Sequence, residues 1–183
     1  MSPAETARES LHTALVQGYL SASDVAKAAE EFISDYEITV SEYSAFDERK
    51  RLVEDALILR YITLVSVMQD RAYRSIAVVE QEDAGPSRRD LTQLMHKLGV
   101  LSDPERFSEC AVARNLSAHI YFDEAEFRTQ RLNEVLRNSA FVVGAFNDAR
   151  AYVLKRGLLP VESLMDIHDV ALDLPEISPN NRP

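Results

Sequence analysis

The amino-acid sequence predicts an all-α protein, an up-and-down helical bundle, and three observations favour that class. Apolar residues recur every three or four positions along most of the chain, which is the spacing of an amphipathic helix. Signals that start and stop helices separate these stretches. No segment keeps the alternation of apolar and polar residues that marks a strand, and the best candidate, Phe141-Val142-Val143, lies inside a helix-period pattern.

Two helices are expected in the first 46 residues. Ser2-Pro3-Ala4-Glu5 has the form of a capping box with proline at the first helical position, so a helix should run from about Pro3 to Tyr19. Ser23 begins a second helix, whose amphipathic pattern should end near Tyr43. Residues 1–46 are therefore predicted to form an N-terminal helical hairpin packed on the rest of the bundle.

Residues 47–174 are predicted to form the main helical bundle, beginning with a long central helix. The segment from Asp47 to Glu82 contains neither glycine nor proline, and Ala84-Gly85-Pro86 breaks it. Ser87 or Asp90 can cap a short helix that ends at Gly99.

Two further helices and a short last one complete the predicted bundle. Ser102-Asp103-Pro104-Glu105 is a second capping-box pattern, so a helix should run from about Pro104 to Ile120 or Tyr121. Asp123 should cap the next helix, which continues to Lys155 with Gly157 as its stop. Residues 161–172 are expected to form a last short helix, and residues 175–183, rich in proline, a flexible tail.

Composition favours a soluble cytoplasmic protein. Of 183 residues, 46% are apolar and 27% charged, and we find neither a run of 18 apolar residues nor a signal-peptide pattern, so no membrane association is expected. The single cysteine, Cys110, excludes an internal disulfide framework. The four histidines are scattered without a cysteine or histidine at ligand spacing, so no zinc site is expected.

The most informative run for function is Arg114-Asn115-Leu116-Ser117-Ala118-His119-Ile120-Tyr121. It places a permanent cation, an amide, an imidazole and a phenol within about two turns of one predicted helix. A guanidinium can hold a phosphate with a planar fork of donors, and an imidazole titrates near neutrality. These residue types suit phosphodiester chemistry without a metal ion.

Arg-x4-His-x-Tyr, with Asn directly after the Arg, on a late helix of an all-helical chain resembles the HEPN superfamily, and within it the HepT-type ribonuclease toxins. Leu98-Gly99-Val100-Leu101-Ser102 resembles the approach to this motif in those toxins. The resemblance covers roughly Asp47 to Val153 and implies a HEPN-like four-helix unit. It also implies that a partner nucleotidyltransferase antitoxin can adenylylate Tyr121.

The expected reaction is endonucleolytic RNA cleavage by the ribose 2′-hydroxyl, with Arg114, Asn115 and His119 as the catalytic residues. His119 is expected to act as general base or acid, Arg114 to stabilise charge on the phosphorane-like transition state, and Asn115 to orient the imidazole or a phosphate oxygen. No metal or other cofactor is needed because the nucleophile lies within the substrate. Arg114 and His119 are about 140° apart around the helix, so we expect a homodimer that brings two copies of the motif together, with Ile120 and Phe122 in the contact.

The distribution of charge is compatible with an RNA substrate although the net charge is −10. Residues 1–50 carry ten acids and four bases, whereas residues 105–156 carry seven acids and eight bases. Four arginines downstream of the motif could attract phosphate groups: Arg128, Arg131, Arg137 and Arg150.

Structural interpretations stand beside the catalytic ones. Arg114 could form an ion pair with Glu109 or an acid of the first helices, Asn115 could bridge two helices, and Tyr121 could bury its ring. The Asp70-Arg71 pair is interpreted as solvated charge. The whole chain could accordingly be a ribonuclease toxin of a toxin-antitoxin or phage-defence pair, a non-catalytic HEPN module that binds nucleotide or a partner protein, or a helical scaffold with a chance motif.

Overall fold

The computed structural model describes residues 3–33, 37–85, 87–118 and 124–174, and within these ranges it confirms an all-α bundle without strands. The helical elements are α1 (Pro3–Glu30), α2 (Val40–Ser44), α3 (Glu48–Val67), the π-helical segment η2 (Met68–Ala72), α4 (Tyr73–Val79), α5 (Arg88–Leu98), α6 (Pro104–Ala118), α7 (Ala125–Arg156) and the 3₁₀ turn η3 (Val161–Leu164).

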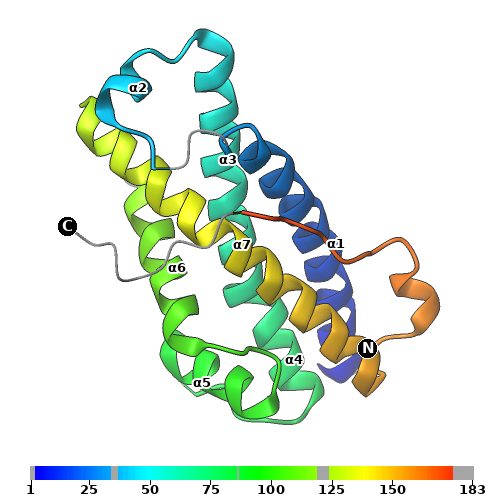
Figure 1. Ribbon diagram of the computed structural model, residues 1–183. Coiled ribbons are helices and arrows are strands. Elements are labelled where there is room, and N and C mark those ends of the chain that lie inside the picture. Colours follow the sequence, from blue (N-terminus) through cyan, green and yellow to red (C-terminus); the bar gives the residue numbers. More distant parts are fainter. Residues whose placement is uncertain (1–2, 34–36, 86, 119–123, 175–183) are drawn as a thin grey trace.

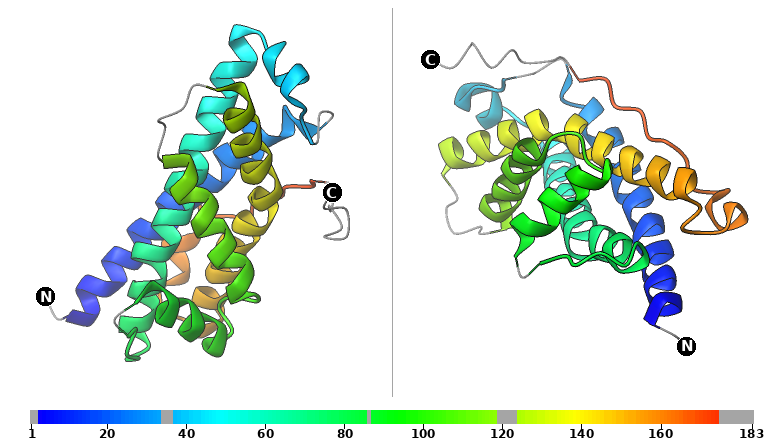
Figure 2. Two further views of the ribbon diagram at one scale, coloured as in Figure 1. Left: turned by 90° about the vertical axis from the view of Figure 1, so that its left-hand side faces the viewer. Right: turned by 90° about the horizontal axis from the view of Figure 1, so that it is seen from below.

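The long helices α1, α3, α6 and α7 surround one apolar core. Figure 1 shows α3 continuing into α4 along the length of the molecule, while α6 returns beside α3 and α7 crosses the bundle obliquely. Figure 2 shows the same bundle from the side and from below. Helix α1 packs against α3, α4 and α7, and α6 packs against α3, α5 and α7. Leu15, Leu64, Met68 and Phe146 are fully buried where these helices meet.

The first helix is longer than the sequence pattern predicts, and the prediction that it ends near Tyr19, with a new helix from Ser23, is wrong. Helix α1 continues without a break from Pro3 through Ser23 to Glu30. Gly18 is buried where α1 crosses α7, and a Cβ atom there would lie 2.9 Å from Cδ2 of Phe146. The glycine therefore allows a close helix crossing. The predicted second helix is reduced to α2, which Thr39 and Glu42 start with a capping box.

The predicted central helix is present, but it contains a π-helical segment. The backbone is helical from Glu48 to Val79, and η2 interrupts the α-helical hydrogen bonding at Met68–Ala72. The N–H of Tyr73 donates to the carbonyl of Met68, five residues earlier. Such π-helical turns often occur at functional sites because they re-aim the side chains of one turn.

Local capping signals set both ends of α5 and the end of α7 as expected, whereas the N-cap of α7 is Glu124, which makes no side-chain cap bond, and not the predicted Asp123. Ser87 and Asp90 form a capping box at the start of α5, and Gly99 ends that helix with a φ of 77°. Gly157 ends α7 with a φ of 62°. These left-handed positions favour glycine. At the start of α6, Asp103 rather than Ser102 caps the helix, because its Oδ1 accepts from the N–H of Arg106 at 2.9 Å.

The segment after α7 forms an extended strap instead of the helix predicted at residues 161–172. Only Val161–Leu164 is helical, as a 3₁₀ turn. The side chain of Asn147 on α7 donates to the carbonyl of Val170 and accepts from its N–H, at 2.8 and 2.9 Å. These bonds satisfy the backbone of the strap from outside, so it needs no helical bonds of its own.

Candidate functional site

Helix α6 turns Arg114 toward the interior of the bundle. Phe107, Cys110, Ala113 and Ser117 form a buried stripe along α6, and Arg114 lies beside this stripe with only 7% of its surface exposed. Asn115, one position later, is about 100° further around the helix and is exposed. The structure therefore separates two of the three predicted catalytic residues onto different faces of α6.

The guanidinium of Arg114 is held by two neutral acceptors on the central helix. Its Nη1 donates to Oγ of Ser66 at 3.0 Å, and its Nη2 donates to Oε1 of Gln69 at 3.3 Å. Its Nε is buried and has no acceptor among the described residues. The π-helical segment carries Gln69, which is itself buried, and so supplies one of the two acceptors.

Arg114 has no carboxylate partner in the part of the chain that the structure describes, so the ion pair with Glu109 considered from the sequence is absent there. Glu109 instead accepts from Arg106 at 2.6 Å. Asp70, the acid whose charge acts on Arg114, forms a bidentate pair with Arg88 at 3.0 and 3.1 Å. Burial, and next the nearby Arg88 cation, lower the pKa of the Arg114 guanidinium. Because arginine does not deprotonate in proteins, Arg114 remains a buried cation that no carboxylate of the described residues contacts.

The remaining predicted site residues lie elsewhere or outside the described ranges. The side chain of Asn115 makes no hydrogen bond to another described residue. His119 and Tyr121 lie outside the described residues, as do Ile120, Phe122 and Asp123. The distance from Arg114 to His119 is therefore still a matter of prediction.

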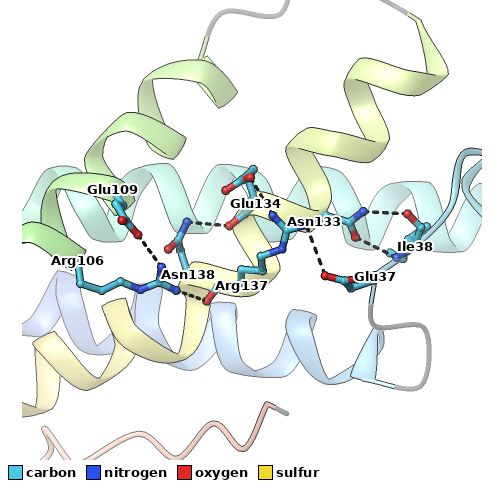
Figure 3. Close-up of polar contacts among 8 residues, drawn as sticks. All are labelled: Glu37, Ile38, Arg106, Glu109, Asn133, Glu134, Arg137 and Asn138. Atoms are coloured by element: carbon cyan, nitrogen blue, oxygen red, sulfur yellow. Dashed lines mark hydrogen bonds and ion pairs between the residues drawn. The ribbon is translucent and has the colours of Figure 1, made fainter. Parts of the chain in front are cut away.

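The four downstream arginines are paired with acids of the same chain. Arg131 is buried against Glu54, with Nη2 3.3 Å from Oε1, and Arg128 contacts Glu54 and Asp55. Arg150 pairs with Asp169 on the strap at 2.9 Å. Figure 3 shows Arg137 between Glu134 and Glu37, beside the paired contacts of Asn133 with the backbone of Ile38. The expectation that these arginines form a phosphate-attracting surface is not supported, because their charges are used in holding elements together.

Sequence reasoning missed a buried carboxylate network on α3. Glu54 is fully buried, accepts from the hydroxyl of Tyr43 at 2.8 Å and pairs with Arg131. Burial, and next the hydrogen bond to Glu54, raise the pKa of Tyr43 to about 12. The network joins α2, α3 and α7, and its members are too far apart in the sequence to reveal one another.

Sequence reasoning also missed an open cleft of about 650 Å³ between α1, α3 and η2, lined by both polar and apolar side chains. The cleft borders Arg114, because Ser66 lines it and accepts the hydrogen bond from Arg114. Its charged lining residues are Arg60, Asp70 and Arg71. Asp70 and Arg71 were interpreted from the sequence as solvated charge. Ser66 and Asp70 are four residues apart and therefore lie on one face of the central helix. This spacing is the signal that could have placed Asp70 beside Ser66 in the cleft.

No family model, curated protein or solved structure matches this chain. The HEPN resemblance therefore rests on the motif residues themselves. Within the described ranges, no group of three or more His, Cys, Asp or Glu side chains is arranged to hold a metal ion. No helix in those ranges is both long enough and apolar enough to cross a lipid bilayer.

Proposed function

We propose that this chain is a HEPN-type endoribonuclease that cleaves RNA without a metal ion, as the toxin of a toxin-antitoxin or phage-defence pair. The observation that carries the proposal is the state of Arg114, a buried guanidinium whose partners among the described residues are neutral and whose Nε has no acceptor there. Buried charges are normally paired, because removing a charge from water is costly. A phosphate group supplies the missing negative charge and accepts a forked pair of hydrogen bonds.

In the proposed reaction the ribose 2′-oxygen attacks the adjacent phosphorus and the 5′-oxygen leaves. His119 removes the 2′-hydroxyl proton or protonates the leaving oxygen, and Arg114 stabilises the charge that develops on the phosphate oxygens. The products are a 2′,3′-cyclic phosphate and a 5′-hydroxyl. The incoming phosphate replaces the longer of the two hydrogen bonds that hold Arg114, which runs from Nη2 to Gln69 at 3.3 Å.

A homodimer belongs to this proposal, because the helix that the sequence predicts to continue past Ala118 would separate Arg114 from His119 by about 140°. Val112 and Leu116 are 57% and 51% exposed, one turn apart on α6, and they flank the exposed Asn115. Exposed apolar residues at such spacing suit a contact between two copies of the helix. A nucleotidyltransferase antitoxin that modifies Tyr121 is proposed as the controlling partner.

The test is cleavage of labelled single-stranded RNA by the purified chain in a chelator. The wild-type chain should leave cyclic phosphate ends, and His119→Ala should lose at least about a hundredfold in rate, as expected for removal of an acid or base. Overproduction should arrest growth unless His119 is changed. If the wild-type dimer, shown by mass spectrometry to be unmodified at Tyr121, leaves varied RNAs intact with and without magnesium, the ribonuclease proposal fails.

A non-catalytic HEPN module that binds nucleotide or a partner protein is the second candidate, and one observation favours it. Arg114 and Asn115 face different directions, and Arg114 is enclosed by Ser66 and Gln69, so the isolated chain presents no assembled set of catalytic groups among its described residues. This candidate predicts binding without cleavage and no growth arrest on overproduction.

A further inference from the structure

The cleft beside Arg114 has a local excess of positive charge in a chain whose net charge is −10. Two arginines line it directly, and two more lie immediately behind its wall, where they are bonded to the lining residues Ser66 and Asp70. Two aspartates oppose these four cations. The cations are Arg60, Arg71, Arg88 and Arg114, and the acids are Asp24 and Asp70.

Arg71 is the lining cation that can accept an external anion at least cost. Its Nη1 donates to the neutral amide oxygen of Gln17 at 2.8 Å, and it has no ion pair with any described residue. Arg60, by contrast, pairs with Asp24 at 3.1 Å. A phosphate that replaces the Gln17 contact gives the Arg71 cation an anionic acceptor in place of a neutral one, and so adds an ion pair to the hydrogen bond.

Ser66 offers a hydrogen-bond donor at the wall of the cleft. Its Oγ accepts from Arg114, and its own hydroxyl proton has no acceptor among the described residues. A hydroxyl that accepts from a cation is polarised and becomes a stronger donor. Ser66 can therefore transmit part of the charge of the buried Arg114 to an anion in the cleft.

We propose that this cleft between α1, α3 and η2 binds consecutive phosphate groups of single-stranded RNA. This deepens the proposed function, and rests on it, by placing the path of the substrate strand beside Arg114. Arg60 and Arg71 are separated by about 16 Å along the helix axis at ~1.5 Å per residue. That span exceeds a single phosphate and suits a strand that passes along a basic groove. The recognised chemistry is the phosphate anion, which a free nucleotide also carries.

The test uses the full chain and a fluorescein-labelled ten-nucleotide uridine oligomer with 2′-O-methyl groups, which cannot be cut through its 2′-oxygen. Anisotropy titrations compare the wild-type chain, Arg71→Gln and the matched control Arg49→Gln. Arg49 is an exposed arginine of α3 outside the cleft, and among the described residues its one ion pair is with exposed Glu31. Losing one phosphate contact should reduce the salt slope of log K by about 0.7, and should weaken binding roughly eightfold at about 50 mM salt. Arg49→Gln should bind as the wild type does, and melting curves should show that both variants are folded.

Each outcome decides between the cleft and the ribonuclease. Binding that depends on Arg71 supports the cleft, even if ordinary RNA is never cut, in which case only the ribonuclease proposal fails. Equal binding by Arg71→Gln and Arg49→Gln, or no binding by the wild type, overturns the cleft, whether or not RNA is cut. Competition by uridine 5′-monophosphate at equal phosphate concentration would identify a free nucleotide as the occupant and overturn the proposal of an RNA strand.

Discussion

The position of Arg114 follows from its neighbours on α6. Phe107, Cys110, Ala113 and Ser117 lie at three- and four-residue spacing and are buried, so a residue three or four positions from them is carried inward. A lysine there would keep its charge on a flexible stem, whereas the planar guanidinium can be fixed by Ser66 and Gln69. The sequence predicted that Arg114 bears function, but the acceptors lie 48 and 45 residues away and could not be predicted.

Removing the hydroxyl of Ser66 should destabilise the fold. In Ser66→Ala, Nη1 of Arg114 loses its acceptor in a partly buried place, and an unsatisfied donor of this kind costs on the order of 1 kcal/mol. Thr63→Ala is the control, because the Thr63 hydroxyl only donates to the Leu59 carbonyl of its own helix. That control should change the free energy of unfolding by no more than about 0.5 kcal/mol. Urea unfolding measures both, and equal values for the two variants would contradict the burial of Arg114.

The hydrogen bond from Tyr43 to Glu54 should make stability depend on alkaline pH. The pKa of Tyr43 is raised to about 12 from its ordinary value of 10, so the folded state holds the phenol proton more tightly than the unfolded state does. Its contribution to stability is therefore complete below about pH 10 and is lost as the pH rises through about 12.

Comparing the wild type with Tyr43→Phe isolates this contribution. The difference in their free energies of unfolding should stay constant up to about pH 10 and then shrink toward pH 12, while other groups titrate equally in both proteins. Denaturant unfolding at a series of pH values measures it. A difference that does not change over that range would argue against the Tyr43–Glu54 bond.

At the scale of elements, the sequence predicts helix ends well where the signal is local. Ser87, Gly99 and Gly157 act through their own backbone or side chain within a few residues, and each occupies the position expected of it. The end of α6 is different, because its predicted extent past Ala118 lies outside the described residues. The fold class follows from the same local patterns, and the structure confirms it.

Elements set by distant contacts could not be predicted. The π-helical segment η2 depends on packing and on the role of Gln69 toward α6, and no local pattern indicates it. The strap after α7 is extended because Asn147 satisfies the backbone of Val170. The cleft depends on α1 and α3 lying side by side, so its residues are spread over more than fifty positions.

Two glycine-to-alanine substitutions should have opposite effects on stability. Gly18 lies under Phe146, and a Cβ atom 2.9 Å from that buried ring forces the α1–α7 crossing apart, at a cost of about 1–3 kcal/mol. A Cβ atom added at Gly144, inside α7, would meet no other atom within 4 Å, so Gly144→Ala should gain up to about 1 kcal/mol from helix propensity. Thermal unfolding measures both changes. A stabilised Gly18→Ala would show that α1 and α7 do not cross closely at Phe146.

At the scale of the whole molecule, the negative net charge does not describe the surface that would meet RNA. The excess of acids over bases lies in the first fifty residues and after residue 157, and several of the remaining acids pair with arginines of another element. The cleft beside Arg114 keeps cations in excess. Physiological salt screens exposed charges beyond roughly 8 Å. The charges close to the cleft, and not the net charge of the chain, therefore steer an anionic ligand toward it.

The proposed dimer makes a prediction that concerns two chains together. If Arg114 of one chain serves the phosphate at His119 of its partner, a mixed dimer of Arg114→Gln and His119→Ala chains keeps one complete site. Each homodimer of a single variant keeps none. Mixing the two inactive proteins should therefore restore about a quarter of wild-type cleavage, while sedimentation monitors the exchange of subunits. After exchange, half of the dimers are mixed, and each mixed dimer keeps one of its two sites. Arg114→Gln shortens the side chain but keeps a polar group near Ser66, so the fold is expected to persist. An active wild-type dimer whose mixed variants stay inactive would place both residues of a site in the same chain.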